Sequence, residues 1–283
     1  MLADLLSTFL HALTVAIRSR LTHRGAMVAD SSHVLILLLL LAAGAAAGLL
    51  NALAGGGSIF TFPVLILAGI PPIAANITNT VALCPGYVGG VLAQRRDLEG
   101  QGRRMLLLLP LAAAGGVAGA LLLAQSSDAL FEGLVPVLLI VACALLAIQD
   151  RIRAALQKRF ARLGLGWAIV PVLIAAVYGG YFGAGISVIF LAVIGLTIDD
   201  TLTRLNGLKQ AMSLVANVAA ATLFVASGHV VWPAAAAVAA GSLAGGAAGG
   251  KLARSVKPAT LRLIVIAIGV ATAIAFVARH YFA

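Results

Sequence analysis

The stretch Gly55-Gly56-Gly57-Ser58-Ile59-Phe60 interrupts strongly apolar sequence with three consecutive glycines, and an apolar run, a break and Asn79 follow it. A similar series returns about half a chain later, as Gly183-Ala184-Gly185-Ile186-Ser187 followed by an apolar run, a break and Asn206. Glycine-rich interruptions at matching positions of two halves are typical of transporters that bind their substrate near the middle of the membrane. The duplication therefore predicts a membrane protein with a binding site between its halves.

The composition agrees with a membrane protein. Of the 283 residues, 62% are hydrophobic and only 10% are charged, and the mean hydropathy is +1.09, whereas soluble domains carry about 25% charged residues. Backbone groups in lipid must be hydrogen-bonded internally, and the sequence lacks the alternating pattern of a membrane β-barrel. We therefore predict an all-α integral membrane protein with about eight transmembrane helices in two four-helix repeats, each containing a short broken or re-entrant helix.

The apolar segments set the predicted boundaries. Repeat one occupies residues 33–149, a basic loop follows at 150–164, and repeat two occupies 165–280, all within one transmembrane domain, 33–283. The apolar pieces 59–70 and 186–196 reach only about 16 to 18 Å as helices, roughly half of a 30 Å hydrocarbon core. If each piece is counted with the helix after it, the halves are parallel. If each crosses separately, the halves are inverted, and the sequence leaves both open.

Basic residues predict the orientation. They gather before the first span and in two loops, namely Arg18, Arg20 and Arg24, then Arg95, Arg96, Arg103 and Arg104, then Arg151, Arg153, Lys158, Arg159 and Arg162. In an eight-pass count these three clusters share one side, which the positive-inside rule makes cytoplasmic, with the N-terminus. Lys251, Arg254 and Lys257 fall on the other side in this count. Basic charge in short loops beside spans does not predict nucleic-acid binding.

The first 32 residues are predicted to form a leader that is either an interfacial helix or disordered. Its arginines follow the apolar part, whereas those of a cleavable signal precede it. Met27 lies close to the first full span and is an alternative start. Cys84 and Cys143 both lie in predicted spans, where a small apolar role is expected and no disulfide is implied.

The glycine stretches are the first candidate binding elements. A glycine run before a short helix permits a sharp turn and exposes the first amide groups of the helix, which together with the helix dipole favour an anion. The alternative is close helix packing, which explains the glycines spaced four apart in continuous spans, such as Gly115 and Gly119. For the glycine runs beside half-length helices, both readings stay open.

Polar residues after each break are the second group of candidates. Asn79 and Asn206 are matched between the repeats, and Lys209 lies deeper than Arg204, which can pair with Asp200 at the membrane face. Capping and interhelical hydrogen bonds are the alternative for Asn and Thr. The predicted substrate-binding residues are Gly56, Gly57, Ser58, Thr78, Asn79, Gly185, Ser187, Asn206, Lys209 and Asn217.

Two segments resemble a known family. Residues 49–58, continuing through Phe62-Pro63 to the segment 73–80, are similar to the first-half signature of the sulfite exporter TauE/SafE family, also called the toluene sulfonate uptake permease family. Residues 178–185, then 205–210 and Asn217, resemble its second repeat, although Gly183-Ala184-Gly185 replaces the three glycines found in many relatives. The resemblance implies an inner-membrane permease for small sulfur-containing anions such as sulfite, sulfonates or sulfoacetate, coupled to an ion gradient.

The sequence also predicts an alternative function and a set of partners. A passive anion channel would use the same chemistry, and only transport against a gradient would separate it from a carrier. An enzyme is not expected, because His229 and His280 stand alone and no metal-ligand spacing occurs within the spans. No cofactor or metal is expected. The predicted partners are a small anionic substrate, the bilayer and a coupling proton or sodium ion, and the packing glycines would permit a homodimer.

Overall fold

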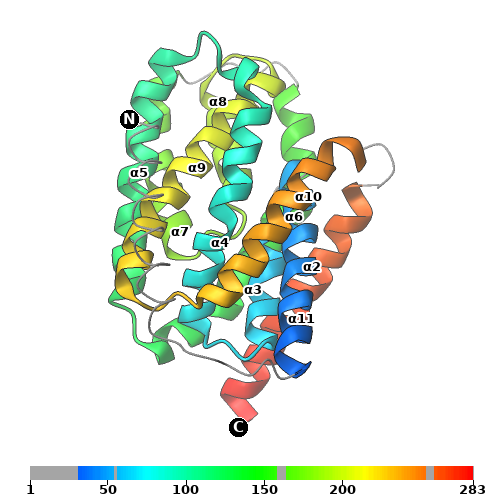
Figure 1. Ribbon diagram of the computed structural model, residues 1–283. Coiled ribbons are helices and arrows are strands. Elements are labelled where there is room, and N and C mark those ends of the chain that lie inside the picture. The colour runs from blue at the N-terminus through cyan, green and yellow to red at the C-terminus, as the bar shows by residue number, and fades with distance from the viewer. Residues whose placement is uncertain (1–30, 54–55, 158–163, 253–257, 283) are drawn as a thin grey trace.

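The computed structural model describes residues 31–53, 56–157, 164–252 and 258–282 of the chain. Within these ranges the regular structure is helical, as the sequence predicts (Figure 1). The elements are α2 (Ser31–Leu53), α3 (Gly57–Leu67), α4 (Pro72–Ala93), η1 (Arg95–Leu98), α5 (Gly102–Ala124), α6 (Asp128–Gln157), η2 (Leu165–Ala168), α7 (Ile169–Tyr181), α8 (Ile186–Thr197), α9 (Leu202–Ser227), α10 (Trp232–Leu252) and α11 (Pro258–Phe282).

The two glycine stretches produce two short helices. Gly56 precedes α3 with a φ of 92°, and Gly185 precedes α8 with a φ of 80°. Both are left-handed conformations that glycine adopts without the steric penalty of a side chain. α3 has 11 residues and α8 has 12, so each is about 17 to 18 Å long and shorter than the hydrocarbon core. The predicted half-length helices at both positions are confirmed.

Helix packing follows the same pattern in both halves of the chain. α2 packs along α10 as α5 packs along α7, and α4 packs on α10 as α5 packs on α9. α4 meets α9, and α6 meets α11, so corresponding helices also contact each other. In Figure 1, α2, α10 and α11 form one side of the bundle, and α5, α7 and α9 form the other. We call α2–α6 the first half and α7–α11 the second half.

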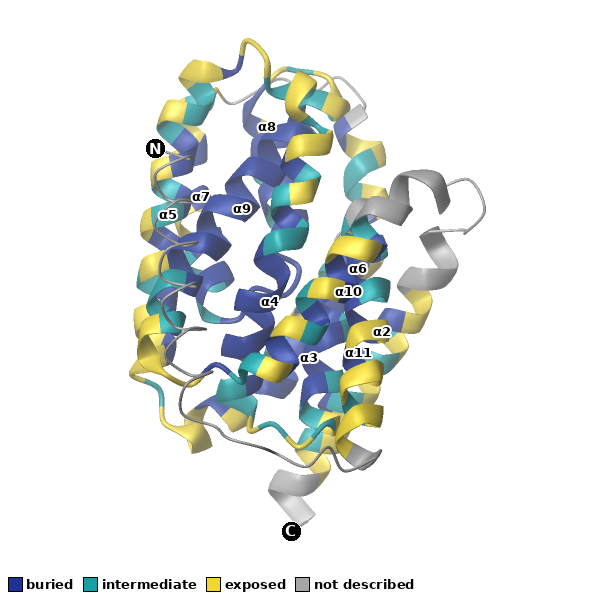
Figure 2. Cartoon of the chain, viewed as in Figure 1, coloured by how far each residue is buried: buried dark blue, intermediate teal, exposed yellow. Residues whose placement is uncertain are grey.

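The outer surface of the bundle is apolar and the interior holds polar groups. Four helical segments are long and apolar enough to cross a membrane, counted over the described residues: His33–Asn51, Gly102–Ala124, Asp128–Leu156 and Leu202–Ser227. Large apolar side chains such as Leu106 and Ile174 are exposed, whereas Asn76, Asn79 and Lys209 are buried. Figure 2 shows that α9 is buried along most of its length. These buried polar residues lie on α4 and on α9.

The ends of the helices change the predicted orientation. In Figure 1 the segment with Arg95 and Arg104 lies at the upper end of the bundle, whereas α2 begins at the lower end. The eight-pass count placed the residues before α2 on the same side as this segment. The structure differs because α3 and α8 run as separate helices, which reverses the chain once more in each half. α10 consequently ends toward the upper end of the bundle in Figure 1. Residues 1–30 and 253–257 lie outside the described ranges.

Candidate functional site

α6 brings the two glycine breaks together at the centre of the bundle. A Cβ atom added to Gly56 would lie 3.1 Å from Leu146 Cδ1, and one added to Gly185 would lie 3.6 Å from Ala142 Cα. Ala142 and Leu146 are one helical turn apart on the same face of α6, so the breaks lie within about 6 Å of each other along its axis. Sequence positions separated by half the chain thus meet at one place.

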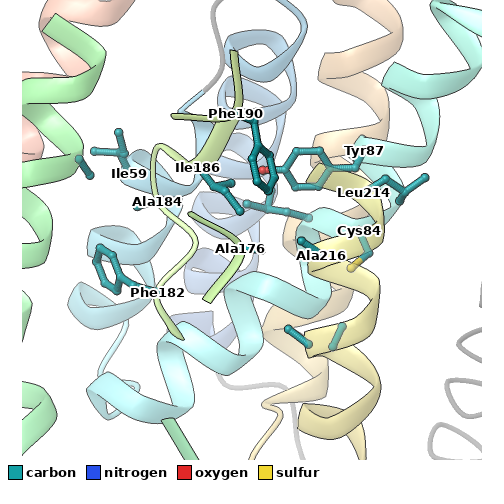
Figure 3. Close-up of a cluster of buried hydrophobic side chains, with 14 of the residues drawn as sticks. Ile59, Cys84, Tyr87, Ala176, Phe182, Ala184, Ile186, Phe190, Leu214 and Ala216 are labelled. Carbon is teal, nitrogen blue, oxygen red and sulfur yellow. The ribbon is translucent and has the colours of Figure 1, made fainter. Parts of the chain in front are cut away.

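Aromatic rings pack between the breaks. Phe62 of α3 and Phe182, which precedes the second break, pack edge to face with ring centroids 5.3 Å apart. Phe131 of α6 lies against Phe182, with ring centroids 6.4 Å apart. Figure 3 shows Phe182, Ala184 and Ile186 following one another through the second break, with Ile59 of α3 nearby. The two short helices therefore begin in a common, well-packed core.

The first break is held by polar side chains of its own half. The N–H of Gly57 donates to Asn51 Oδ1 at 2.9 Å. Asn79 of α4 donates through Nδ2 to the carbonyl of Ser58 at 3.5 Å, and its Oδ1 accepts from the hydroxyl of Thr61. One donor at the start of α3, which the sequence assigned to substrate, is therefore already used by the protein. Asn79 therefore lies beside the start of α3.

The second break is held partly by the first half. The hydroxyl of Tyr178 donates to the carbonyl of Ala184 at 2.7 Å. Asn76 of α4 donates through Nδ2 to the carbonyl of Tyr181 at 2.8 Å, across the boundary between the halves. The buried hydroxyl of Tyr87, also from α4, interacts with the side chain of Ser187 in the first turn of α8. α4 of the first half therefore contacts the second break through two side chains, Asn76 and Tyr87.

α9 carries the remaining predicted residues at two depths. Asn217 donates to the carbonyl of Ser213 at 2.8 Å, and a Cβ on Gly183 would lie 4.0 Å from its Oδ1. Lys209 is buried and donates through Nζ to Asn206 Oδ1 at 3.3 Å. Eight residues separate Lys209 from Asn217, or about 12 Å along the helix. Asn217 therefore lies beside the second break, while Lys209 and Asn206 lie nearer the start of α9.

The helix starts also revise which residues correspond between the halves. The residue capping α4 is Pro71 and the residue capping α9 is Thr201. Counted from these caps, Asn79 corresponds to Lys209, and Asn76 corresponds to Asn206. The sequence predicted that Asn79 corresponds to Asn206, because the exact helix starts are not evident from the sequence. The first half therefore has a neutral amide where the second half has a cation.

Thr78 has a structural contact away from the breaks. Its hydroxyl accepts a hydrogen bond from the N–H of Val231 at 3.0 Å, just before α10 begins. This bond ties α4 to the start of α10. The geometry matches the alternative that the sequence left open for threonine, an interhelical hydrogen bond.

Three buried polar atoms near the breaks have no hydrogen-bond partner among the described residues: Asn51 Nδ2, Asn76 Oδ1 and Ser213 Oγ. Most buried polar groups in proteins are paired, and an unpaired one is a reason to look for a ligand or water. Asn51, Asn76 and Ser213 are not among the substrate-binding residues predicted from the sequence. Ser213 lies one turn before Asn217 on the same face of α9, so this spacing is the signal that could have identified it.

The pair predicted at the membrane face is present. Arg204 Nε lies 3.0 Å from Asp200 Oδ1, and Arg104 of α5 also binds this carboxylate. Partial burial raises the pKa of Asp200, but hydrogen bonds from Arg104, the Thr201 N–H and Arg204 outweigh it, so the pKa lies below its usual value. This cluster joins the start of α5 to the start of α9 and is separate from the breaks.

Within the described ranges, no group of three or more His, Cys, Asp and Glu side chains could hold a metal ion. Cys84 and Cys143 are buried free thiols. The polar groups that the structure brings together are amides, hydroxyls and cations, which suit the binding of a small anion by hydrogen bonds and charge.

Comparisons with known proteins agree with this picture. The model of the family described as "Sulfite exporter TauE/SafE" matches residues 40–276. A "Probable membrane transporter protein" of Haemophilus influenzae is 28% identical over 225 residues, covering 77% of this chain and 85% of that protein. The "Probable membrane transporter protein YfcA" of Escherichia coli K12 is 23% identical over 219 residues, covering 77% of this chain and 81% of that protein. No solved structure matches.

Proposed function

The chain belongs to the sulfite exporter TauE/SafE family of membrane transporters, and we propose that it is a secondary transporter of small sulfur-containing anions in the cell inner membrane. The substrates are sulfite, sulfonates, sulfoacetate or similar anions. The observation that carries this proposal is the meeting of two half-length helices, each beginning at a left-handed glycine, beside α6. Helix starts present N–H groups and a positive dipole end, which favour an anion.

We place the substrate between the halves. It docks against the starts of α3 and α8, which are formed by Gly56, Gly57, Ser58, Gly185 and Ser187. The neighbouring helices contribute Asn79, Asn206, Lys209 and Asn217. Thr78 contributes indirectly, by bonding α4 to the residue before α10. The unpaired atoms of Asn76 and Ser213 support this location, because they are buried and lie on the helices that flank the breaks. No group of acidic side chains faces the breaks in the described ranges, so the arrangement favours anions over cations.

Alternating access is the proposed mechanism. The matching packing pairs support two structurally repeated halves of five helices, running in opposite directions across the membrane. In this mechanism the halves rock against each other around the bound anion. The Asn76 to Tyr181 hydrogen bond crosses the boundary between them and would change during that motion. A proton or sodium gradient drives the cycle, and the protein acts without an enzymatic step, as a monomer or a homodimer.

Transport by purified protein in lipid vesicles tests this function. Vesicles with an imposed proton or sodium gradient should accumulate labelled sulfite or a labelled sulfonate above the external concentration. Equilibration without accumulation, under both gradients, would instead support a passive anion channel of the same fold. Absence of any protein-dependent flux for all these anions would contradict both.

A matched pair of glycine variants ties the transport to the breaks. Gly185 has φ 80° and ψ 0°, and Gly228 at the end of α9 has φ 77° and ψ 0°. Alanine at either position meets the same backbone strain, about 1 to 2 kcal/mol. We expect Gly185→Ala to lose transport and Gly228→Ala to keep it. Equal transport by both variants would show that the second break is not part of the site.

A further inference from the structure

The unpaired polar atoms beside the two breaks differ in kind. Among the described residues, the atom near the first break is Asn51 Nδ2, a donor, and those near the second are two oxygens, Asn76 Oδ1 and Ser213 Oγ. Asn76 is 1% exposed and Ser213 is 0% exposed. A donor suits an anion, whereas an amide oxygen only accepts. The oxygens of a sulfur oxyanion also only accept, so Asn76 Oδ1 requires a different partner.

The orientation of the Asn76 amide is set by its neighbour. Its Nδ2 donates to the carbonyl of Tyr181 at 2.8 Å. Turning the amide over would place two carbonyl oxygens against each other, so the hydrogen bond assigns the nitrogen and the oxygen. Oδ1 is therefore held beside the end of α7 without a donor of its own.

α9 brings two more oxygens toward the same segment. Asn217 donates through Nδ2 to the carbonyl of Ser213 at 2.8 Å, and a Cβ on Gly183 would lie 4.0 Å from Asn217 Oδ1. Gly183 follows Tyr181 by two residues, which span at most about 7 Å. Asn76 and Asn217 therefore border the same short segment, and Ser213 lies one helical turn from Asn217 on the same face.

The backbone at the second break offers opposite charges to its two sides. α7 ends at Tyr181 and α8 begins at Ile186. The last carbonyls of a helix have no partner further along that helix, and they carry the negative end of its dipole. In transporters with discontinuous helices, such carbonyls coordinate Na⁺ while helix starts meet the anionic substrate. The second break can therefore hold a cation at the end of α7 and an anion at the start of α8.

The kind of oxygen indicates the kind of cation. The side chains of Asn76, Ser213 and Asn217 are neutral, and within the described ranges no group of three or more His, Cys, Asp and Glu could hold a metal ion. Calcium and transition metals are bound mainly through carboxylate, imidazole or thiolate groups. Neutral amide, hydroxyl and carbonyl oxygens instead suit a monovalent cation. None of these groups gains a proton near neutral pH, so they favour Na⁺ over a proton.

The positive charge of Lys209 is directed away from this position. Lys209 precedes Ser213 by one helical turn, but its Nζ reaches back to Asn206 Oδ1 at 3.3 Å. Asn206 lies seven residues before Ser213, or about 10 Å along the helix. Lys209 therefore stays with the proposed anion, and the oxygens beside the second break are left to a second ion.

We propose that Asn76 Oδ1, Ser213 Oγ and Asn217 Oδ1, with backbone carbonyls of residues 181–183, form a sodium site beside the second break. The proposal rests on the proposed transport function and names its coupling ion and the place where that ion binds. A bound Na⁺ adds positive charge next to the start of α8 and strengthens its attraction for the anion. Because Asn76 belongs to the first half and the other two side chains to the second, motion of the halves opens or closes the site.

Thermal unfolding of the purified protein tests the site, with NaCl replaced stepwise by choline chloride or KCl at constant chloride concentration. An ion that binds only the folded protein raises its melting temperature with increasing concentration. Na⁺ should raise it more than K⁺, and choline should not raise it. In Ser213→Ala, the Na⁺ concentration that produces a given rise should increase about tenfold. Without Na⁺ its stability should be unchanged, because Ser213 Oγ has no partner among the described residues.

Ser242→Ala is the matched control. Ser242 is also 0% exposed, but its hydroxyl donates to the carbonyl of Ala239 within α10 at 2.9 Å. This variant should respond to Na⁺ as the unaltered protein does. Asn217→Ala removes a second proposed ligand and should need more Na⁺, as Ser213→Ala does. A merely structural role for Ser213 or Asn217 would change stability equally with and without Na⁺.

Uptake into lipid vesicles connects the site to transport. An imposed Na⁺ gradient should drive accumulation of labelled sulfite, and a proton gradient without Na⁺ should not. Ser213→Ala should require about tenfold more Na⁺ for the same initial rate, while Ser242→Ala should need no more than the unaltered protein.

The outcomes are distinguishable. If Na⁺ stabilises the unaltered protein no more than choline or K⁺ does, water fills the site and the proposal is overturned; uptake driven by a proton gradient would then leave the transport function standing. Equal Na⁺ responses in Ser213→Ala and the unaltered protein overturn it as well, and this variant decides should Asn217→Ala not fold. If the Na⁺ response follows the variants but no anion is transported, the sodium site stands and the transport function fails.

Discussion

The two glycine breaks have the same backbone and different surroundings. Both short helices follow a left-handed glycine, and both have a serine two residues later, Ser58 in α3 and Ser187 in α8. In the first break, Asn51 occupies the N–H of Gly57. In the second break, the N–H of Ile186 has a weaker turn-like bond to the Gly183 carbonyl at 3.4 Å. The backbone geometry is common to both halves, and the first half uses side chains to close its own break.

The helices that follow α3 and α8, namely α4 and α9, also differ in hydrogen bonding and charge. Asn79 binds back to α3, where Thr61 is its partner. The position in α8 that corresponds to Thr61 is Phe190, and the one that corresponds to Asn79 is Lys209, which bonds to Asn206 instead. Figure 3 shows Phe190 beside Tyr87 of α4 in an apolar cluster. The first half is therefore neutral and internally hydrogen-bonded, whereas the second half carries the charge that can attract an anion.

The largest expected effect comes from filling the space at the start of α3. A Cβ on Gly57 would lie 2.5 Å from the carbonyl oxygen of Ala47 and 2.9 Å from Asn51 Nδ2, so Gly57→Ala must displace the helix start. We expect a loss of about 1 to 3 kcal/mol of stability and of nearly all transport. Thermal unfolding and vesicle uptake measure these. Gly102 begins α5 with nothing within 4 Å of an added Cβ, so Gly102→Ala is the control and should behave as the unaltered protein.

The next largest effect tests the charge difference between the halves. Lys209→Met removes the buried cation and keeps the length of the side chain. Anion affinity should fall about tenfold or more, while stability stays the same or rises, since an apolar side chain is easier to bury than a charge. Asn79→Met at the corresponding position should instead lower stability, because it breaks two hydrogen bonds at the start of α3. Equal effects of both variants on stability and binding would contradict the contrast between the halves.

The sequence predicted those features that local rules determine. Three consecutive glycines before an apolar run too short to cross the membrane were enough to predict α3, and the same logic predicted α8. The pairing of Asp200 with Arg204 follows from their spacing on one helix and is observed. The sequence also predicted that Lys209 lies deeper than Arg204, and Lys209 is buried in the structure.

The remaining features depend on contacts between residues far apart in the chain. Thr78 was predicted to face the substrate, but its partner is Val231, 153 residues later. Arg153 was predicted to lie in a basic loop at 150–164, but α6 continues to Gln157 and includes it. The orientation of α2 depended on whether the short helices reverse the chain, which hydropathy does not reveal. Such features depend on how distant segments pack against each other, and local patterns in a single sequence do not predict them.

A smaller effect is expected where the halves are joined at the second break. Asn76→Ala removes the bond to the Tyr181 carbonyl and should cost about 1 kcal/mol, since hydrogen bonds between membrane helices contribute little each. Thr78→Val removes the bond from Val231 and should cost a similar amount. Transport separates the two, because only Asn76 lies at the break. Uptake should fall in Asn76→Ala and persist in Thr78→Val. The reverse result would mean that the α4 to α10 contact, and not the second break, limits transport.

The smallest effect concerns the cluster of Arg104, Asp200 and Arg204 at the end of the bundle. Like the Asn76 hydrogen bond, this cluster joins the two halves, but it does so through charged groups. Arg104 binds Asp200 across the boundary, and Arg204 binds it from the same helix end. Because the pKa of Asp200 lies below its usual value, the carboxylate contributes stability above pH ~4, and this contribution is lost as the pH falls through the lowered pKa. For a partly exposed pair it amounts to about 1 kcal/mol or less.

Asp200→Asn should therefore lower the melting temperature slightly at neutral pH, and the difference from the unaltered protein should shrink on acidification. High salt should reduce the difference as well, because the cluster is partly exposed. Glu132→Gln, at an exposed position in the first turns of α6, is the control and should show no comparable dependence. A difference that persists unchanged at low pH would mean that Asp200 acts through its shape and hydrogen bonds. In that case the cluster at the start of α9 would join the halves through shape and hydrogen bonds, and Lys209 would remain the residue that attracts the anion.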